Sequence, residues 1–170
     1  MARGGIRITG LDQWANFLQT LPTDRINRMK DRVLRTAGLR TMEYLHDLTP
    51  VRTGRLAASF SMGNPDSVYE LNVNSGVSYV RVGTAVDYSI HVNDGYTQKE
   101  GQFVPGRWTG SGFHYDPSAK GGMVLTGKTI AGAHMFEKTM QYLEEDIPTI
   151  IEFELRRLWA EVDGGNNGSR

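Results

Sequence analysis

Residues 122–129 match the pattern of a nucleotide-binding loop. Their sequence, Gly-Met-Val-Leu-Thr-Gly-Lys-Thr, fits the P-loop pattern G-x-x-x-x-G-K-S/T. A working P-loop follows a buried strand and opens a helix, because backbone N–H groups and the helix dipole must converge on the phosphates. The preceding residues 114–121 are polar and include Pro117, which cannot occupy a central strand. Nucleotide binding at this segment, through Lys128, is therefore an alternative function and not the first expectation.

The other reactive side chains form no catalytic or metal-binding pattern. The histidines, His46, His91, His114 and His134, include no pair at i and i+4 and no H-E-x-x-H sequence. There is no G-x-S-x-G elbow, and the consecutive acids at 144–146 fan around a helix instead of converging. The chain has no cysteine, which excludes thiol catalysis, disulfides and cysteine-based zinc sites. We therefore expect a protein without enzymatic activity, with no catalytic residue, no cofactor and no metal ion.

The charges balance overall but are unevenly distributed along the chain. Nineteen basic residues oppose nineteen acidic ones, which excludes a histone-like polycation. Residues 1–60 hold ten basic and five acidic side chains, residues 61–128 five and six, and residues 129–170 four and eight. The N-terminal part is therefore basic and the C-terminal part acidic. No apolar run approaches the roughly 18 residues of a membrane span, and the N-terminus lacks the apolar region of a signal peptide, so we expect no membrane contact.

Four arginines with helical spacing form a stripe near the N-terminus: Arg25, Arg28, Arg32 and Arg35. Three interpretations are open. The stripe can be solvated helix surface, or it can pair with an acidic helix, for example around Glu152 and Glu154 of another subunit, because the segment charges are complementary. It can also contact the phosphates of a nucleic acid, although such proteins usually interleave aromatic residues or carry a high net charge.

The spacing of apolar residues predicts the elements that carry these side chains. Helical spacing predicts helices over residues 11–20, 22–48 and 136–162. Thr49-Pro50 ends the second helix, and Pro148 implies either two helices or one kinked helix in the third region. Alternation predicts strands over residues 56–62, 69–73 and 77–83, the first two joined as a hairpin by a turn at 63–66. Residues 86–92 fit either a strand or a helical turn.

Glycine is concentrated in one part of the chain. Nine of the 20 glycines fall between Gly95 and Gly132, and residues 93–127 are predicted to be a long extended loop. Its aromatic residues Trp108, Phe113 and Tyr115 are candidates for docking onto a partner.

These elements predict the α+β fold class. The expected architecture has N-terminal helices, a small mainly antiparallel sheet, C-terminal helices packed on the sheet and the long glycine-rich loop. We expect a single domain over residues 1–163, with residues 93–127 as the extended loop and residues 164–170 as a flexible tail.

Two stretches resemble a known family. Residues 49–60 read Thr-Pro-Val-Arg-Thr-Gly-Arg-Leu-Ala-Ala-Ser-Phe, which resembles the P-x-x-T-G-x-L-x-x-S signature of tail-completion proteins of tailed bacteriophages. These are the head–tail joining, or neck, proteins, a class of minor tail components. Val82-Gly83-Thr84, Tyr88 and residues 93–97 resemble the V-G-T…Y-A-x-x-V-E-x-G-T stretch of the same family. Ser89, Asn93-Asp94 and Tyr96 depart from that second pattern.

The motif residues have expected structural roles. They are Pro50, Thr53, Gly54, Leu56, Gly83, Tyr88 and Gly95. Pro50 stops the preceding helix, and Thr53-Gly54 makes the turn into the sheet. Gly83 and Gly95 allow a positive φ at strand ends.

The resemblance implies a structural protein of the virion. Such proteins form a ring, commonly a hexamer, that joins the tail tube to the head connector around the DNA channel. The implied partners are other copies of the chain, a head connector or stopper protein, and a tail-tube or tail-terminator protein. Genomic DNA would pass through the lumen without sequence-specific contact. The protein would be assembled in the host cytoplasm and reside in the tail or neck, with the 93–127 loop contacting a neighbouring ring.

Overall fold

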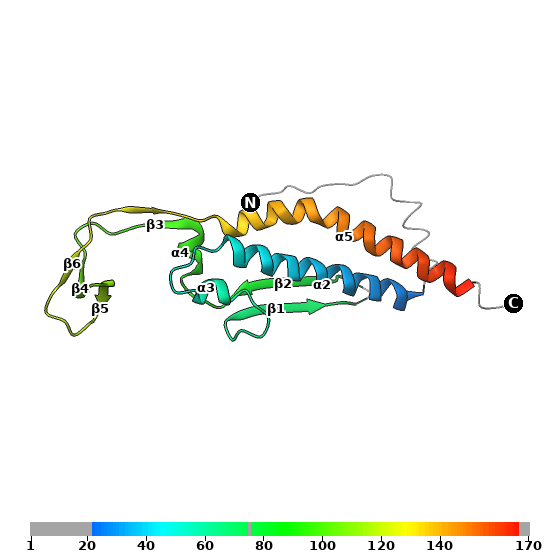
Figure 1. The fold of residues 1–170 in the computed structure, drawn as a ribbon, viewed down its shortest axis with the longest axis horizontal. Helices are drawn as coiled ribbons and strands as arrows, with labels where there is room; N and C mark the ends of the chain where they lie inside the picture. The colour runs from blue at the N-terminus through cyan, green and yellow to red at the C-terminus, as the bar shows by residue number, and fades with distance from the viewer. Residues whose placement is uncertain (1–21, 75, 167–170) are drawn as a thin grey trace.

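The computed structural model describes residues 22–74 and 76–166, and its elements form a layered body with a projecting arm (Figure 1). The helices are α2 (Thr23–Leu48), α3 (Arg55–Ala58), α4 (Ser89–Asp94) and α5 (Met135–Asn166). The strands are β1 (Ser67–Asn72), β2 (Tyr79–Thr84), β3 (Gly95–Thr97), β4 (Phe103–Thr109), β5 (Gly112–Tyr115), β6 (Gly122–Val124) and β7 (Thr129–Ala131). The α+β class is confirmed. The helix expected over residues 11–20 lies outside the described residues.

The long helix α2 begins and ends where the sequence predicts. The carbonyl of Pro22 accepts from Arg25 N at 2.9 Å, and Asp24 lies in the first turn, where it suits the helix dipole. Thr49 has an extended backbone (φ −78°, ψ 122°), because a residue before proline is excluded from the helical region. The Thr49 hydroxyl donates to the carbonyl of Leu45, which satisfies one of the free carbonyls at the helix end.

Helices α2 and α5 run antiparallel in a constant register. Arg32 pairs with Glu154, and Arg25, seven residues earlier, donates to the backbone carbonyl of Glu161, seven residues later. At the other end of the pair, Tyr44 packs edge-on against Tyr142, with ring centroids 5.4 Å apart. Tyr44 also donates a hydrogen bond to Asp146, which raises the pKa of the tyrosine. The basic N-terminal part and the acidic C-terminal part of the chain therefore meet along this helix pair.

The C-terminal region differs from the expectation in three ways. It is one helix through Pro148, not two; Pro148 is exposed, so a backbone carbonyl that loses its intrahelical partner can be hydrated. Helix α5 packs along α2, whose other side covers the β1–β2 hairpin, so it does not lie directly on the sheet (Figure 1). It also continues to Asn166, so residues 164–166 are helical, and residues 167–170 lie outside the described residues.

The segment predicted as a strand over residues 56–62 is wrong, because its first part is the short helix α3. Gly54, with φ +78°, reverses the chain immediately before the helix. Leu56, Ala57 and Phe60 are buried, which is helical spacing, whereas Met62 is exposed. The predicted turn from Thr53-Gly54 therefore leads into a helix and not into the sheet.

Because residues 56–62 are not a strand, the strands pair differently from the prediction. Strand β1 pairs with β2 in an antiparallel hairpin, with Ser67 opposite Thr84 and Asn72 opposite Tyr79. The strands predicted over residues 69–73 and 77–83 are present as β1 and β2, but they pair with each other, and the predicted hairpin across residues 63–66 is not formed. Arg55 instead holds this turn to α3 by pairing with Asp66 at 2.9 Å, which lowers the pKa of that carboxyl.

The body is held by a small apolar core. Its residues come from α2, α3, the turn after α3, the segment before α4, and α5: Leu45, Leu56, Phe60, Val86 and Met135. Phe60 is fully buried and meets Phe136 edge-on at 6.3 Å between ring centroids. The ambiguous segment 86–92 leads into helix α4, so the helical alternative is the correct one. Among the described helices, none has the length and apolar character needed to span a membrane.

The glycine-rich stretch is an ordered arm, not a structureless loop. Strands β3 and β7 form a two-stranded ribbon at its root, and β5, β4 and β6 form a three-stranded antiparallel sheet farther out. In Figure 1 this arm extends away from the body, beyond the end of the helix pair. The prediction of a loop over residues 93–127 is therefore wrong in its local structure, although the excursion itself is present.

Candidate functional site

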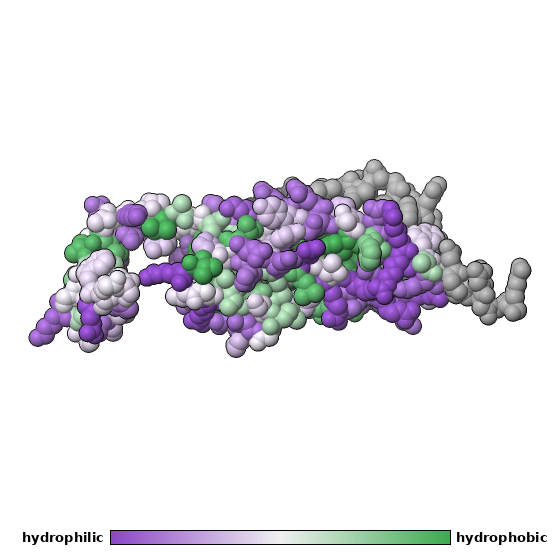
Figure 2. Space-filling model, viewed as in Figure 1, coloured by the Kyte–Doolittle hydropathy of each residue, from purple (hydrophilic) through white to green (hydrophobic). Residues whose placement is uncertain are grey.

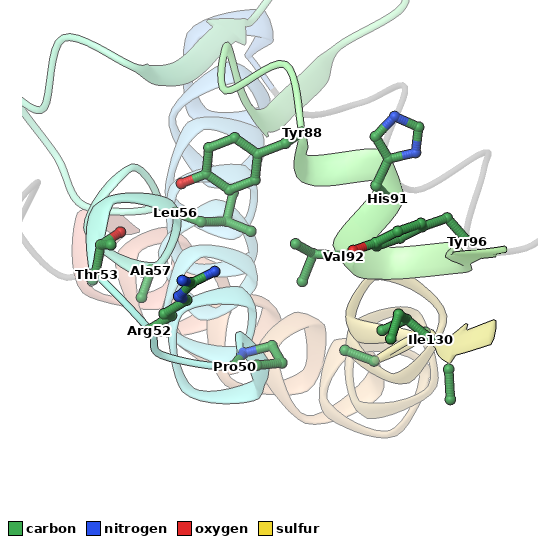
Figure 3. A pocket seen from close by; sticks show the side chains of 14 residues that line it. Pro50, Arg52, Thr53, Leu56, Ala57, Tyr88, His91, Val92, Tyr96 and Ile130 are labelled. Atoms are coloured by element: carbon green, nitrogen blue, oxygen red, sulfur yellow. The ribbon is translucent and has the colours of Figure 1, made fainter. Parts of the chain in front are cut away.

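Most of the family-motif residues gather around one groove at the root of the arm. The groove has a volume of about 850 Å³, and Figure 3 shows side chains from the α2–α3 connection facing others from α4, β3 and β7. Pro50, Thr53, Gly54, Leu56 and Tyr88 all line it. Its remaining lining residues are Arg52, Ala57, His91, Val92, Tyr96, Ile130, Ala131, Gly132 and Ala133.

One buried polar residue, Asn93, fixes the wall of the groove. Its Oδ1 accepts from the backbone N–H of Phe136 at 3.0 Å, and its amide donates to Asp94 at 2.7 Å and to Glu137 at 3.1 Å. The side chain thereby ties the end of α4 to the beginning of α5 and satisfies an unpaired N–H of the first turn of α5. The sequence showed only that Asn93 departs from the family pattern, so this role was missed.

The two motif glycines differ in their backbone geometry. Gly95 has φ +77° and ψ −179°, a conformation that is essentially confined to glycine. A Cβ added there would meet the backbone of β7 at Ala131 C, 2.9 Å away. Gly83 has no positive φ; it lies within β2 opposite Val68, so the role expected for it is wrong. Gly95 is the residue that allows the arm to leave the body.

The variant Gly95→Ala should lower the free energy of unfolding by about 3 kcal/mol or more, from backbone strain and the collision with β7 together. Gly101 is a matched control, because it has the same φ of +77° but nothing within 4 Å of an added Cβ. Gly101→Ala should therefore cost only about 1–2 kcal/mol, the strain alone. Urea denaturation followed by circular dichroism measures both. Equal losses for the two variants would contradict the close packing at Gly95.

The groove offers an apolar docking surface. Its floor is apolar, from Leu56, Val92 and Ile130, and Arg52 on its wall has no hydrogen bond or ion pair with a described residue. His91 packs edge-on against Tyr96, with ring centroids 6.0 Å apart. Within residues 22–74 and 76–166, no group of acidic, histidine or cysteine side chains has the arrangement of a metal site.

The predicted docking residues come together on one face of the arm. In the sheet β5-β4-β6, Trp108 lies directly opposite Phe113, and residues directly opposite in a ladder share a face. The rings of this pair meet edge-on at 5.4 Å. Successive alternate residues complete the set, which we name the apolar arm face: Val104, Trp108, Phe113, Tyr115 and Met123. The other face carries Arg107 opposite His114, and Phe103 opposite Val124, whose side chains are 53% and 60% exposed.

The apolar arm face is open to solvent. Trp108 is 68% exposed and Tyr115 is 67% exposed. Figure 2 shows that the surface of the arm as a whole mixes hydrophobic and hydrophilic residues. Gly106 at the centre of the face is covered by the ring of Phe113, whose Cε1 would lie 3.0 Å from an added Cβ. Large exposed aromatic side chains on an ordered sheet are characteristic of a protein interface.

The arginine stripe does not act as one unit. Arg32 donates from Nε to Glu154 Oε2 at 2.5 Å and lies 3.4 Å from Glu161 Oε1 through Nη1. Arg32 and Glu154 therefore pair with each other within one chain. Glu152, the other acid considered for that interface, pairs with Arg156 of its own helix.

The two remaining arginines of the stripe stay on the surface. Arg35 pairs with Asp31 one turn away, and this bond raises the pKa of the arginine further. Arg28 is exposed and makes no ion pair within the described part of the chain. A continuous basic surface for nucleic acid is therefore not formed by these four residues.

The segment that matches the P-loop pattern does not fold as one. Residues 122–124 form β6, and Thr129 begins β7, so no helix follows Lys128. The carbonyl of Lys128 accepts from Gln98 N at 3.0 Å, as part of the ribbon at the arm root. Extended strands cannot aim consecutive N–H groups at one phosphate. The nucleotide-binding alternative therefore has no structural support in this segment.

The fold and the two surfaces define a class of protein: an α+β body that presents an apolar groove and an apolar arm face. The bacteriophage family described as “Bacteriophage HK97-gp10, putative tail-component” matches residues 12–95. The chain belongs to this family of structural phage tail components. The matched residues include the groove motif from Pro50 to Leu56 and end at Gly95, the first residue of the arm.

Two relatives from Bacillus subtilis (strain 168) match over nearly the whole chain. The phage-like element PBSX protein XkdI is 30% identical over 158 residues, which cover 89% of this chain and 97% of the relative. The uncharacterized protein YqbI is 28% identical over 163 residues, covering 89% of this chain and 96% of the relative. No solved structure matches the chain.

Proposed function

We propose that the protein is a structural component of the phage neck, where copies of it form a ring that joins the tail tube to the head connector around the DNA channel. The observation that carries the proposal is the arm, which takes a solvent-exposed apolar face away from its own body. A monomer gains nothing from such a surface, whereas an assembly buries it. The expected stoichiometry is a hexamer, as in the family that the motifs resemble.

The charges of the body fit a protein that encloses DNA without binding it specifically. Arg25 and Arg32, half of the basic stripe, bond to α5 of the same chain. Arg28 and Arg35 stay exposed and are candidates for contact with a neighbouring subunit. The proposed partners are other copies of the chain, a head connector or stopper protein, and a tail-tube or tail-terminator protein.

The proposal is tested by deleting the gene from the phage genome that encodes it and by locating a tagged copy in purified particles. Without the protein we expect DNA-filled heads and separate tails, and complementation with the wild-type chain should restore joined particles. Electron microscopy of the tagged protein should show the label at the head–tail junction. A label at the distal end of the tail, or normal joined particles in the deletion strain, would refute a role in the neck.

A further inference from the structure

We infer that the apolar arm face of one copy packs on an exposed ridge of helix α5 of a second copy, an inference that rests on the proposed ring. The ridge consists of Met140, Glu144, Ile147 and Ile151. These residues are spaced by four, three and four positions, which places them on one face of the helix over three turns. The arm of one subunit would thus lie across the body of the next.

The ridge is an apolar surface that no other described part of the chain covers. Met140 is 57% exposed, Ile147 39% and Ile151 37%. Glu144 lies in the middle of them and has no hydrogen bond or ion pair with any described residue. An apolar stripe with a single unpaired acid at its centre calls for an apolar partner that brings one cation.

The arm supplies both an apolar surface and a cation. Lys120 lies in the connection between β5 and β6, which links Tyr115 to Met123 of the apolar arm face, and forms no ion pair within the described chain. Arg107, on the other face of the sheet, is already paired with Asp116 at 3.1 Å. Lys120 is therefore the free cation nearest in sequence to Tyr115 and Met123, and Glu144 is the free acid on the ridge.

The wider charge distribution supports the same pairing. Residues 98–128 of the arm carry four basic side chains against two acidic ones: Lys99, Arg107, Lys120 and Lys128 against Glu100 and Asp116. Residues 137–147 of α5 carry one basic side chain against four acidic ones: Lys138 against Glu137, Glu144, Glu145 and Asp146. The groove at the arm root is the poorer match for a basic arm, because its own charged side chain is Arg52.

The geometry makes the contact intermolecular. The arm extends beyond the end of its own helix pair, so the apolar arm face lies away from the α5 ridge of the same chain (Figure 1). A contact between two different surfaces, each present once per chain, is heterologous, and a heterologous contact closes into a ring when its rotation permits.

Charge reversal tests the contact directly. Glu144→Lys and Lys120→Glu should each weaken self-association by about tenfold or more, and the two changes in one chain should restore it. Glu145→Lys is the matched control, because Glu145 is also exposed and unpaired among the described residues but lies about 100° around the helix from Glu144. Native mass spectrometry and sedimentation measure the oligomer, and circular dichroism verifies the fold of each variant.

The outcomes separate this inference from the proposed function. Equal effects of Glu144→Lys and Glu145→Lys, or no restoration in the combined variant, overturn the contact. Intact rings with failed head–tail joining in the Lys120→Glu variant also overturn it, because the arm would then dock on a different virion protein; the neck role would stand. A wild-type chain that is monomeric both in solution and in particles refutes the contact, whereas the position of the label in particles independently tests the neck role.

Discussion

Replacing Arg32 by alanine should lower the free energy of unfolding by roughly 3–5 kcal/mol, because it leaves a buried carboxylate without its partner. Glu154 is only 5% exposed, and the Nε of Arg32 is 2.5 Å from its Oε2. The same guanidinium also lies 3.4 Å from Glu161, so one substitution removes both contacts of the arginine with α5. Urea denaturation followed by circular dichroism gives the loss.

Two further variants measure how much the Arg32–Glu154 pair contributes to the free energy of unfolding. Arg28→Ala is the matched control on the same helix, and since Arg28 is exposed and unpaired within the described chain, its loss should stay within about 0.5 kcal/mol. The double variant Arg32→Met with Glu154→Leu should recover most of the stability, because an apolar pair of similar volume needs no desolvation of charge. Similar losses for Arg28→Ala and Arg32→Ala would contradict a buried pair.

The pair of helices α2 and α5 shows which features the sequence predicts and which it does not. The limits of α2 follow from strong local signals, Asp24 in the first turn and Pro50 after the last, and both are confirmed. The opposite charges of the two ends predict that a basic element meets an acidic one. Whether Glu154 belongs to the same chain depends on a contact between residues 122 positions apart, which local patterns do not determine. The matched spacing of seven in Arg25–Arg32 and Glu154–Glu161 is the signal that would have indicated one antiparallel pair.

The strand predicted over residues 56–62 is wrong for a different reason. Alternation of apolar and small residues over seven positions fits a strand, and the same letters fit a helical turn. The outcome depends on the left-handed Gly54, which turns the chain so that Leu56 and Phe60 enter the core together. Tertiary contacts therefore determine the structure of this short segment, because its own preference for helix or strand is weak.

The arm was missed as a folded unit because its strands are short. Three of its five strands have only three residues, which is too few for a detectable period. Glycine lowers their strand propensity further, and Gly106 and Gly122 are compensated by the rings of Phe113 and Phe103 packed above them. The aromatic residues nevertheless did indicate an exposed surface, because the pairing of β4 with β5 places Trp108, Phe113 and Tyr115 on one face.

Removing the arm should abolish head–tail joining while leaving the body folded. Deleting residues 101–125 joins Glu100 to Thr126, two ends that the hydrogen bond from Gly101 N to Leu125 O already holds together at 2.9 Å. The bond from Gln98 N to Lys128 O is retained, and Gly127, with φ +72°, can serve in the new turn. No residue of the core cluster is lost. The body should therefore unfold at nearly the same urea concentration as the wild type.

A point variant separates the docking face from the presence of the arm. Trp108→Ser with Tyr115→Ser keeps the strands but removes the two most exposed rings of the apolar arm face. If each ring contributes about 2 kcal/mol to docking, together they change the affinity by about a thousandfold. The yield of joined particles should then fall nearly as far as with the deletion. His114→Ser, on the opposite face of the same sheet, should leave that yield unchanged. If His114→Ser fails as badly as the double variant, the arm acts through its whole surface, and the apolar face has no special role in joining.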